Sequence, residues 1–451
     1  LLNLNSVTSH FVGVYRISVF KRIDLKEKNI DVISSALSDA FPENADVEET
    51  VLAVINDVKS RGDDALCHYA EKFDGFIPEN FLISDDEIDE AFKNCEAGLI
   101  DAMERAAGRV REFHKTQLHS SRSFNEGNLE VQTVYRPVNR AGCYVPGGRA
   151  SYPSTVLMTV IPAVVAGVSD VVICTPPGED GKISPAVLVA ARMSGVSSVY
   201  AIGGAQAISA MAYGTESIPA VDVIVGPGNI YVATAQRMVS QDVGIAAAFA
   251  GPSEIVVIAD ETANPKFAAI DLIVQAEHGP NGQSWLISPD EKTLKRTLQE
   301  VEVLVDKSKR RQEIMSTFDE GGFAVLVKDL SQAFDVANTI APEHLQLMIE
   351  SPENYLSLIQ NAGAVFMGNM APASVGDYYA GPSHVLPTDR SARFASALTI
   401  NDFVKDIHII SMGADALKEA ADAIIKIADA EGLDAHAESI RLRIEELNDL
   451  A

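Results

Sequence analysis

Apolar residues with helical spacing open the regular part of the chain. Between residues 47 and 120 they recur every three or four positions, which places them on one face of a helix; the clearest run is Val51, Val54, Ile55 and Val58. The stretch Arg61-Gly62-Asp63-Asp64 then combines a helix stop with acidic residues that suit the start of the next helix. The sequence therefore predicts consecutive helices over residues 47–120.

From about residue 130 the pattern changes to short β-branched runs that alternate with alanine-rich helical stretches. Near-continuous apolar strands joined by helices are typical of a parallel sheet that helices cover on both faces. We therefore expect an α/β fold with right-handed crossover connections. The predicted strands comprise residues 171–174, 199–202, 221–225, 255–259, 323–327 and 364–367.

Two further helical regions have recognisable ends. A helix should begin at Asn264-Pro265, an N-cap followed by a first-turn proline, and stop at Gly279-Pro280. The tail from about Asp415 is helical in pattern, with a break at Gly432. A chain of 451 residues also implies two or three domains rather than one core.

Charge and cysteine content narrow the partners and the compartment. The formal net charge of −27 argues against a surface for nucleic acid or anionic membrane, because phosphates would be repelled. The four cysteines form no Cys-x-x-Cys pair and are typical of a reducing compartment, so we expect a cytoplasmic protein. The longest apolar run, residues 156–168, contains Pro162 and is too short to span a bilayer. Residues 1–22 lack Asp and Glu, which is faintly like a transit segment, although an ordinary N-terminal arm is expected.

The adjacent residues Glu343 and His344, after Pro342, offer a carboxylate and an imidazole that can move protons at neutral pH. Pro342 fixes its own φ and biases Ala341 away from helix, so the pair should leave an ordered turn. Taken alone, a Glu-His dipeptide is more often a solvated turn before a strand.

Three glycine-rich turns sit where predicted strands end: residues 144–148, 203–206 and 226–229. Ligands bind at that edge of open α/β sheets, and a helix N-terminus there can hold phosphate. The chain contains no Gly-x-Gly-x-x-Gly, since the third position after Gly226-Pro227-Gly228 is Tyr231. A dinucleotide would therefore be bound in another way, and the glycines alone could serve only as tight turns.

Other segments carry residues of metal-binding type. Gln275 and His278, three apart on a predicted helix, can face one spot and suit zinc, or the histidine can simply cap the helix end. The Gly- and Pro-rich stretch 376–384 should be a loop that presents Asp377 and His384, although such loops are often plain turns. In the tail, Glu431 and His436 flank the break at Gly432, where they can equally be caps and solvated charges.

Taken in chain order, these segments resemble the histidinol dehydrogenase family, whose members catalyse the last two steps of histidine biosynthesis. The resemblance covers nearly all of the chain from about residue 45, while the first 25 or so residues fit poorly. It rests on these strings: Tyr144 to Gly148, Gly203 to Ile208, Gly226 to Asn229, Gly251 to Glu254, Gln275 to Gly279, Pro342 to Leu345, Asn361 to Phe366, Val375 to Asp377 and His384 to Thr388.

The resemblance implies zinc- and NAD-dependent, four-electron oxidation of L-histidinol to L-histidine through L-histidinal. It implies proton transfer by Glu343 and His344, and NAD contacts at Tyr144, Gln206 and Asn229. The implied zinc ligands are Gln275, His278, Asp377 and His436. The implied substrate contacts are Ser253, Gln275, His278, His344, Asp377, Glu431 and His436.

The fold expected on this basis has two Rossmann-like parallel-sheet domains without the glycine fingerprint, plus small N-terminal and C-terminal helical segments. The expected layout is an arm (1–38), a catalytic domain (39–124 with 254–394), an NAD domain (125–253) and a tail (395–451) that completes the partner's site in a homodimer. Two alternatives remain: a related dehydrogenase for another small polar alcohol, and a zinc hydrolase or metabolite-binding protein. Manganese or cobalt would fit the same ligands.

Overall fold

The computed structural model describes residues 14–17, 19–26, 30–38, 45–147, 151–246, 251, 253–279 and 282–449. Residues 1–13 of the predicted N-terminal arm, Gly148 and the predicted helix stop at Pro280 lie outside these residues. The chain divides into two compact units, the first of residues 1–116 with 139–403 and the second of residues 117–138 with 404–451.

The first unit contains a seven-stranded sheet in the order β1-β2-β12-β11-β10-β13-β14. All of its pairings are parallel except β1 with β2. The strands predicted at residues 255–259, 323–327 and 364–367 are confirmed as β10, β12 and β14. The bounds are β1 (Val14–Ile17), β2 (Phe20–Asp24), β10 (Glu254–Ala259), β11 (Gln283–Ser288), β12 (Gly322–Leu326), β13 (His344–Met348) and β14 (Ala364–Met367).

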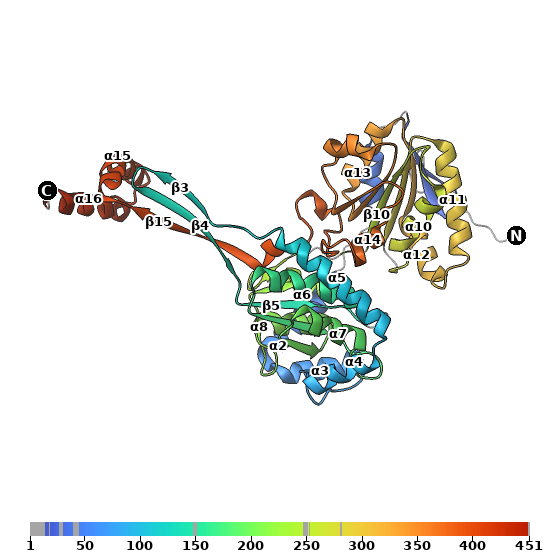
Figure 1. Cartoon of the computed structure of the whole chain (residues 1–451), viewed down its shortest axis with the longest axis horizontal. Helices are drawn as coiled ribbons and strands as arrows, with labels where there is room; N and C mark the ends of the chain where they lie inside the picture. The colour runs from blue at the N-terminus through green and yellow to red at the C-terminus, as the bar shows by residue number, and fades with distance from the viewer. Residues whose placement is uncertain are drawn as a thin grey trace. The chain divides into compact units, whose positions relative to one another are not determined.

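Helices cover both faces of this sheet, as the continuous apolar strands predict (Figure 1). Ile255 and Val257 of β10 pack into one buried cluster with α10, α11 and α12, while Val256 and Ile258 point to the opposite cluster with α1 and α13. These helices are α1 (Asp31–Ser38), α10 (Pro265–Ala276), α11 (Glu291–Val305), α12 (Arg311–Gly321) and α13 (Leu330–Ile340). The predicted cap is confirmed, because the Asn264 side chain accepts from the backbone N–H of Lys266.

A second, five-stranded parallel sheet of the same unit has the order β7-β6-β5-β8-β9. The strands predicted around residues 171–174, 199–202 and 221–225 are confirmed as β6, β7 and β8. The bounds are β5 (Arg140–Tyr144), β6 (Asp170–Thr175), β7 (Ser198–Ala201), β8 (Val223–Val225), β9 (Gly244–Ile245), α6 (Pro153–Ala166), α7 (Pro185–Ser194), α8 (Gly204–Tyr213) and α9 (Ile230–Val239).

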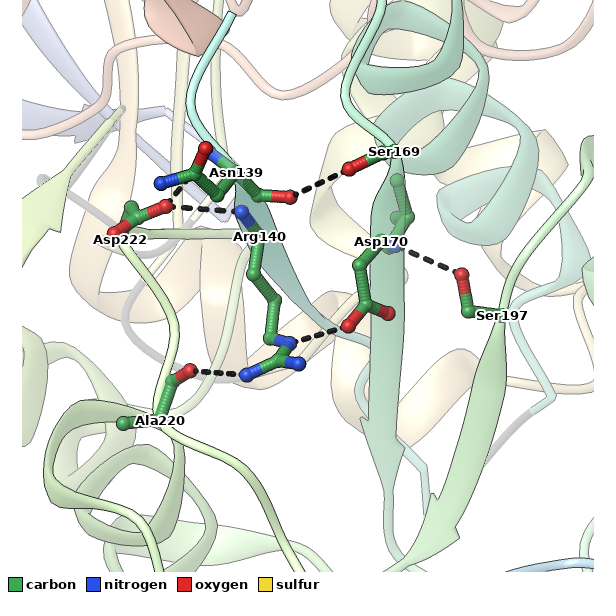
Figure 2. A network of polar contacts seen from close by, with 8 residues as sticks. Asn139, Arg140, Ser169, Asp170, Ser197, Ala220 and Asp222 are labelled. Atoms are coloured by element: carbon green, nitrogen blue, oxygen red, sulfur yellow. Dashed lines mark hydrogen bonds and ion pairs between the residues drawn. The ribbon is translucent and has the colours of Figure 1, made fainter.

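A polar network fixes the amino ends of this second sheet, where Arg140 reaches from β5 toward Asp170 and Ala220 (Figure 2). Its Nε donates to Asp170 Oδ2 at 2.5 Å and its Nη1 to the Ala220 carbonyl at 3.1 Å. Asp222 Oδ2 accepts from the backbone N–H groups of Asn139 and Arg140 at 2.7 and 2.9 Å. The starts of β5, β6 and β8 are thereby held in register, which sets where their carboxyl ends fall.

The helices predicted over residues 47–120 are confirmed, including the break after Arg61. They pack against α6, α7, α8 and α9, and their apolar residues join the core of the five-stranded sheet. This differs from the expected layout, which grouped residues 39–124 with the catalytic sheet; β2, expected in an arm, is paired with β12. Helical periodicity identifies a buried face but not the sheet that covers it. The bounds are α2 (Ala45–Arg61), α3 (Asp63–Asp74), α4 (Asp85–Asn94) and α5 (Ala97–Lys115).

The second unit combines a three-stranded antiparallel sheet, in the order β15-β4-β3, with two helices. The helical tail and its break at Gly432 are confirmed, but the sheet was not expected from the sequence. Its strands carry mixed polar and apolar residues, and β4 and β15 are far apart in the chain. The bounds are β3 (Arg122–Glu126), β4 (Leu129–Pro137), β15 (Val404–Met412), α15 (Ala414–Ala430) and α16 (Asp434–Asp449).

The predicted α/β fold class with parallel sheets is confirmed. None of the helices in the described ranges is long and apolar enough to cross a membrane. The remaining short helices are α14 (Ala373–Tyr378), η1 (Pro352–Leu358), η2 (Ser391–Arg393) and η3 (Ile400–Phe403).

Candidate active site

Glu343 and His344 lie at the amino end of β13, in a turn whose geometry is fixed on both sides. Ala341 ends α13 in the left-handed region (φ 53°), and Pro342 leads directly into the strand. The side chains are not solvated, since Glu343 is 8 % exposed and His344 is 2 % exposed. Their burial excludes a solvated surface turn. A buried acid and imidazole also need polar partners for their side-chain atoms.

The amino edge of the seven-stranded sheet gathers most of the sequence-predicted catalytic and metal residues. The register pairs Glu254 with Gln283 and His344 with Ala364, so these strand starts lie at one edge. Helix α10 runs back to the same edge, because it precedes β11 in the chain. It ends at Ala276, so the buried Gln275 is in its last turn and the exposed His278 lies just beyond it.

The His344 ring is held at Nδ1 and faces a carboxylate at Nε2. Nδ1 lies 3.1 Å from the Glu254 carbonyl oxygen and 3.5 Å from Glu343 Oε2. Because a carbonyl only accepts, Nδ1 carries a proton and Nε2 is the nitrogen left for chemistry. Nε2 has no hydrogen-bond partner among the described residues and lies 3.6 Å from Asp377 Oδ1.

Two carboxylates govern the charge of this imidazole. Burial alone would lower the pKa of His344, but the charges and hydrogen bonds of Glu343 and Asp377 outweigh it and raise the pKa to about 10. Burial would raise the pKa of Asp377, but His344 and the nearby imidazoles of His384 and His278 lower it. Asp377 is therefore an ionised carboxylate facing three histidines.

Asp377 itself lies in α14, whereas the sequence predicted an irregular loop for residues 376–384. His384, after this helix, has Nδ1 3.0 Å from the Asp377 carbonyl oxygen and Nε2 3.3 Å from Thr155 Oγ1 of α6. Both of its nitrogens are thus engaged, and burial lowers the pKa of His384. His384 therefore holds the Asp377 segment rather than offering a free ligand. On the other side, the Phe366 ring lies 5.8 Å from the His344 ring, nearly parallel to it.

Three of the four predicted zinc ligands belong to the first unit, and His436 belongs to the second. Gln275 and His278 come from the end of α10, and His278 is among the groups that lower the pKa of Asp377. Within the described ranges, no three His, Cys, Asp or Glu side chains are grouped so that they could hold a metal ion. The first unit supplies an amide, one imidazole and one carboxylate, which is an incomplete set for a tetrahedral zinc site.

Helix α10 also carries a buried acid, Asp271, four residues before Gln275. Burial raises the pKa of Asp271 to about 7, from an ordinary value of 3.8. When the pKa of an acid is higher in the folded than in the unfolded protein, its contribution to the free energy of unfolding is complete only below the unfolded-state pKa. As the pH rises from there toward the folded-state pKa, that contribution falls by about 1.4 kcal/mol for each pH unit.

Asp271→Asn is therefore expected to raise the apparent thermal unfolding midpoint, relative to the unmodified protein, by more at pH 8 than at pH 4.5. Thermal scans at the two pH values measure the difference. Glu419→Gln, at an exposed position of α15, is the control and should show no such pH dependence. Equal shifts of the Asp271→Asn midpoint at both pH values would contradict the assignment.

The predicted NAD residues lie at the carboxyl edge of the five-stranded sheet. Tyr144 ends β5, and its hydroxyl accepts a hydrogen bond from the Gly204 backbone N–H at 3.1 Å, at the start of the helix that carries Gln206. Gly226, after β8, has φ 114°, and a Cβ there would lie 2.1 Å from the Tyr144 carbonyl oxygen. Only glycine permits this approach. Asn229 caps α9 through Oδ1, which accepts from two backbone N–H groups, so a cofactor contact would use its Nδ2.

The remaining predicted substrate residues fall in separate places. Ser253 immediately precedes β10, and its carbonyl oxygen accepts from the Gln283 N–H at 3.0 Å, which puts it at the catalytic edge. Glu431 and His436 are exposed in the second unit, at the end of α15 and in the first turn of α16.

One residue at this edge was not singled out by the sequence. Glu254 is the first residue of β10, a strand in which all six side chains are buried. Its backbone touches both Glu343 and His344. An acidic residue at the start of an otherwise apolar, buried strand could have indicated a functional position. Its contacts with Glu343 and His344, however, depend on the register of the strands.

Comparison with known proteins identifies the family. A family model described as histidinol dehydrogenase matches residues 39–444. The histidinol dehydrogenase of Methanocaldococcus jannaschii is 45% identical over 397 residues, covering 88% of this chain and 92% of that protein. That of Synechococcus sp. is 45% identical over 404 residues, covering 89% and 93%. The crystal structure of histidinol dehydrogenase from Elizabethkingia anophelis has a TM-score of 0.92 and 36% identity, covering 96% of this chain and 100% of that one. The chain therefore belongs to the histidinol dehydrogenase family.

Proposed function

We propose that this protein oxidises L-histidinol to L-histidine through L-histidinal, with NAD as the hydride acceptor. The observation that carries the proposal is the buried Glu343–His344 pair. His344 Nε2 has no hydrogen-bond partner among the described residues and lies 3.6 Å from Asp377 Oδ1. Two successive oxidations need one base for a hydroxyl proton and another for a water molecule. The pair supplies one group for each.

His344 is the proposed base for the alcohol step. Its Nδ1 is committed to the Glu254 carbonyl, so the substrate hydroxyl proton would be taken at Nε2. The imidazolium that forms is stabilised by the neighbouring Glu343 carboxylate, the strongest of the groups that raise the pKa of His344. Phe366, stacked beside the ring, restricts its orientation.

Glu343 is the proposed base for hydration of the aldehyde. One of its oxygens, Oε2, accepts from the Glu254 N–H at 3.0 Å, which orients the carboxylate. The aldehyde must add water before a second hydride can leave, and a carboxylate within reach of that water can accept its proton. No cysteine is among the proposed catalytic residues, and Cys143 and Cys174 are buried, which raises both thiol pKa values. A thiolate intermediate is therefore not favoured.

The donor atoms fit a borderline divalent metal ion. Gln275, His278 and Asp377 would hold zinc from one chain, with His436 as the fourth ligand, and manganese or cobalt suit the same atoms. A bound ion would neutralise Asp377 and orient the amine and imidazole nitrogens of histidinol. With Asp377 neutralised, His344 faces one carboxylate rather than two. Its pKa then falls toward the range in which imidazole accepts a proton.

The five-stranded sheet is the proposed NAD-binding half. Tyr144, Gln206 and Asn229 come from three loops at one sheet edge, and the N-termini of α8 and α9 open there. Backbone N–H groups at helix N-termini suit the cofactor's phosphates without a Gly-x-Gly-x-x-Gly sequence. The bound cofactor would accept the hydride in each oxidation.

We further propose a homodimer in which Glu431 and His436 of one subunit complete the site of the other. Support comes from the incomplete ligand set of the first unit and from apolar residues exposed on β15, namely Ile407, Ile409, Ile410 and Met412. A three-stranded sheet with so many exposed apolar side chains favours association. A cytoplasmic location remains a prediction from the scattered cysteines.

The test of the proposed function is NADH formation, followed by absorbance, when histidinol and NAD are added. A dehydrogenase for another polar alcohol would favour an amino alcohol without the imidazole, and a hydrolase or binding protein would produce no NADH. Two NADH per histidinol with little response to the imidazole-free alcohol supports the proposal. No NADH from histidinol with metal-loaded protein rules it out.

Removal of the metal should abolish turnover and leave the fold largely intact. The buried clusters on both faces of the seven-stranded sheet are apolar and include none of the proposed ligands, so the ion is not the folding nucleus. Dialysis against a chelator, circular dichroism and NADH assays measure both effects, and added zinc should restore activity. A circular dichroism spectrum of an unfolded chain after chelation would contradict this expectation.

A further inference from the structure

Glu254 is a buried acid that the proposed mechanism does not use. It is 2 % exposed, and within the described ranges no lysine or arginine side chain forms an ion pair with it. Burial raises the pKa of Glu254 well above its ordinary range, and the Glu343 and Asp389 carboxylates raise it further. Both effects disfavour a negative charge on the Glu254 side chain.

The backbone of Glu254 serves both proposed catalytic residues. Its N–H donates to Glu343 Oε2 at 3.0 Å, and its carbonyl oxygen lies 3.1 Å from His344 Nδ1. The two contacts orient the carboxylate and fix which imidazole nitrogen carries a proton. Small movements of this one residue would misplace both groups.

The side chain of Glu254 lies beside backbone groups of two other segments. The backbone N–H groups of Glu343 and Asp389 act to lower the pKa of its carboxyl, which places that carboxyl next to the turn before β13 and the Thr388–Asp389 segment. That segment is tied to the same region a second time, because Thr388 Oγ1 accepts from the Gly251 N–H at 2.5 Å. Oε2 of Glu254 has no hydrogen-bond partner among the described residues.

We propose that Glu254 is a positioning residue for the Glu343–His344 pair, its side chain fixing the peptide groups that orient both catalytic side chains. This inference rests on the proposed function. Holding peptide groups in place requires an oxygen acceptor of glutamate length and no transferable proton.

The experiment compares Glu254→Gln, which keeps shape and an acceptor oxygen, with Glu254→Leu, which keeps volume but has no polar atom. With histidinol and with histidinal as separate substrates, Glu254→Gln should stay within about threefold of the unmodified enzyme in kcat. Glu254→Leu should lose about tenfold to a hundredfold in kcat with both substrates, because both bases move. KM for histidinol should change less than kcat, since of the proposed substrate contacts only Ser253 and His344 adjoin Glu254. Thermal unfolding midpoints and metal content show whether each variant is folded and loaded.

Each outcome decides the matter. Normal kcat for Glu254→Leu overturns the inference, and so does a Glu254→Gln enzyme as slow as Glu254→Leu, because the carboxyl proton would then be needed in the reaction. A Glu254→Leu protein too unstable to assay leaves the decision to Glu254→Gln, whose normal kcat supports positioning by an uncharged acceptor. An unmodified enzyme without activity toward histidinol overturns the proposed function instead.

Discussion

His344→Ala is expected to slow oxidation of histidinol by a factor of about 10²–10⁴, with histidinal affected less. The alcohol step needs a base at the substrate hydroxyl. Nε2 is the ring nitrogen available for it, because Nδ1 is committed to the Glu254 carbonyl. Alanine removes that nitrogen without disturbing the strand, whose backbone pairs with β10 and β14 on either side. Single-turnover NADH formation with each substrate separates the two steps.

Glu343→Ala should show the opposite selectivity, slowing the histidinal step by a factor of about 10²–10⁴. Glu343→Gln tests whether position or charge matters, since glutamine can still accept from the Glu254 N–H but cannot take a proton from water. Glu350→Gln is a matched control at an exposed position two residues beyond the other end of β13, and it should behave normally. If Glu343→Ala oxidised added histidinal at the normal rate, the division of labour would be refuted.

The strands of the two parallel sheets could be predicted from the sequence because both of their faces are buried. Residues 255–259 read as continuous apolar sequence, and every residue of β10 is indeed covered. Helix ends were also predictable where local chemistry sets them, as at the Asn264 cap and at Gly62, whose φ of 54° suits the stop after Arg61.

Long-range pairing could not be predicted in the same way. The strands of the second unit, such as Val404–Met412, mix exposed apolar and charged residues, so no periodicity stands out. Its partner Leu129–Pro137 is distant in sequence, and local propensity contains no information on that pairing. The same limit explains why helices α2 to α5 were grouped with the other sheet.

For the site, the residue types could be read from the sequence, and their proposed roles came from the family resemblance. The contacts between the side chains depend on the register of the strands and could not be predicted. Glu343 and His344 attracted attention as a pair, yet their burial follows from the turn at Ala341 and the strand that begins at His344. The contribution of Glu254 depends on the pairing of β10 with β13, which no local motif reveals.

Whether two subunits share each active site can be tested by complementation between two inactive variants, and the expected gain in activity is large. His344→Ala and His436→Ala proteins should each be nearly inactive alone. If the tail of one subunit completes the site of the other, a heterodimer of the two has one site with both histidines intact and one with neither. Random association of equal amounts makes about half of the dimers heterodimers, so about a quarter of all sites should be intact. Co-refolded mixtures should therefore recover about a quarter of normal NADH formation.

Mixing His344→Ala with Glu343→Ala is the matched control for this experiment. Both lesions lie in the same two-residue segment, so every site in every dimer keeps one of them and activity should not return. Different affinity tags on the two chains allow heterodimers to be purified and counted. A site built within one chain could not recover in either mixture, because every chain carries a lesion. Verified heterodimers of His344→Ala and His436→Ala that stay inactive would therefore exclude the shared site, and recovery only in that mixture would place His436 opposite His344 across the two subunits.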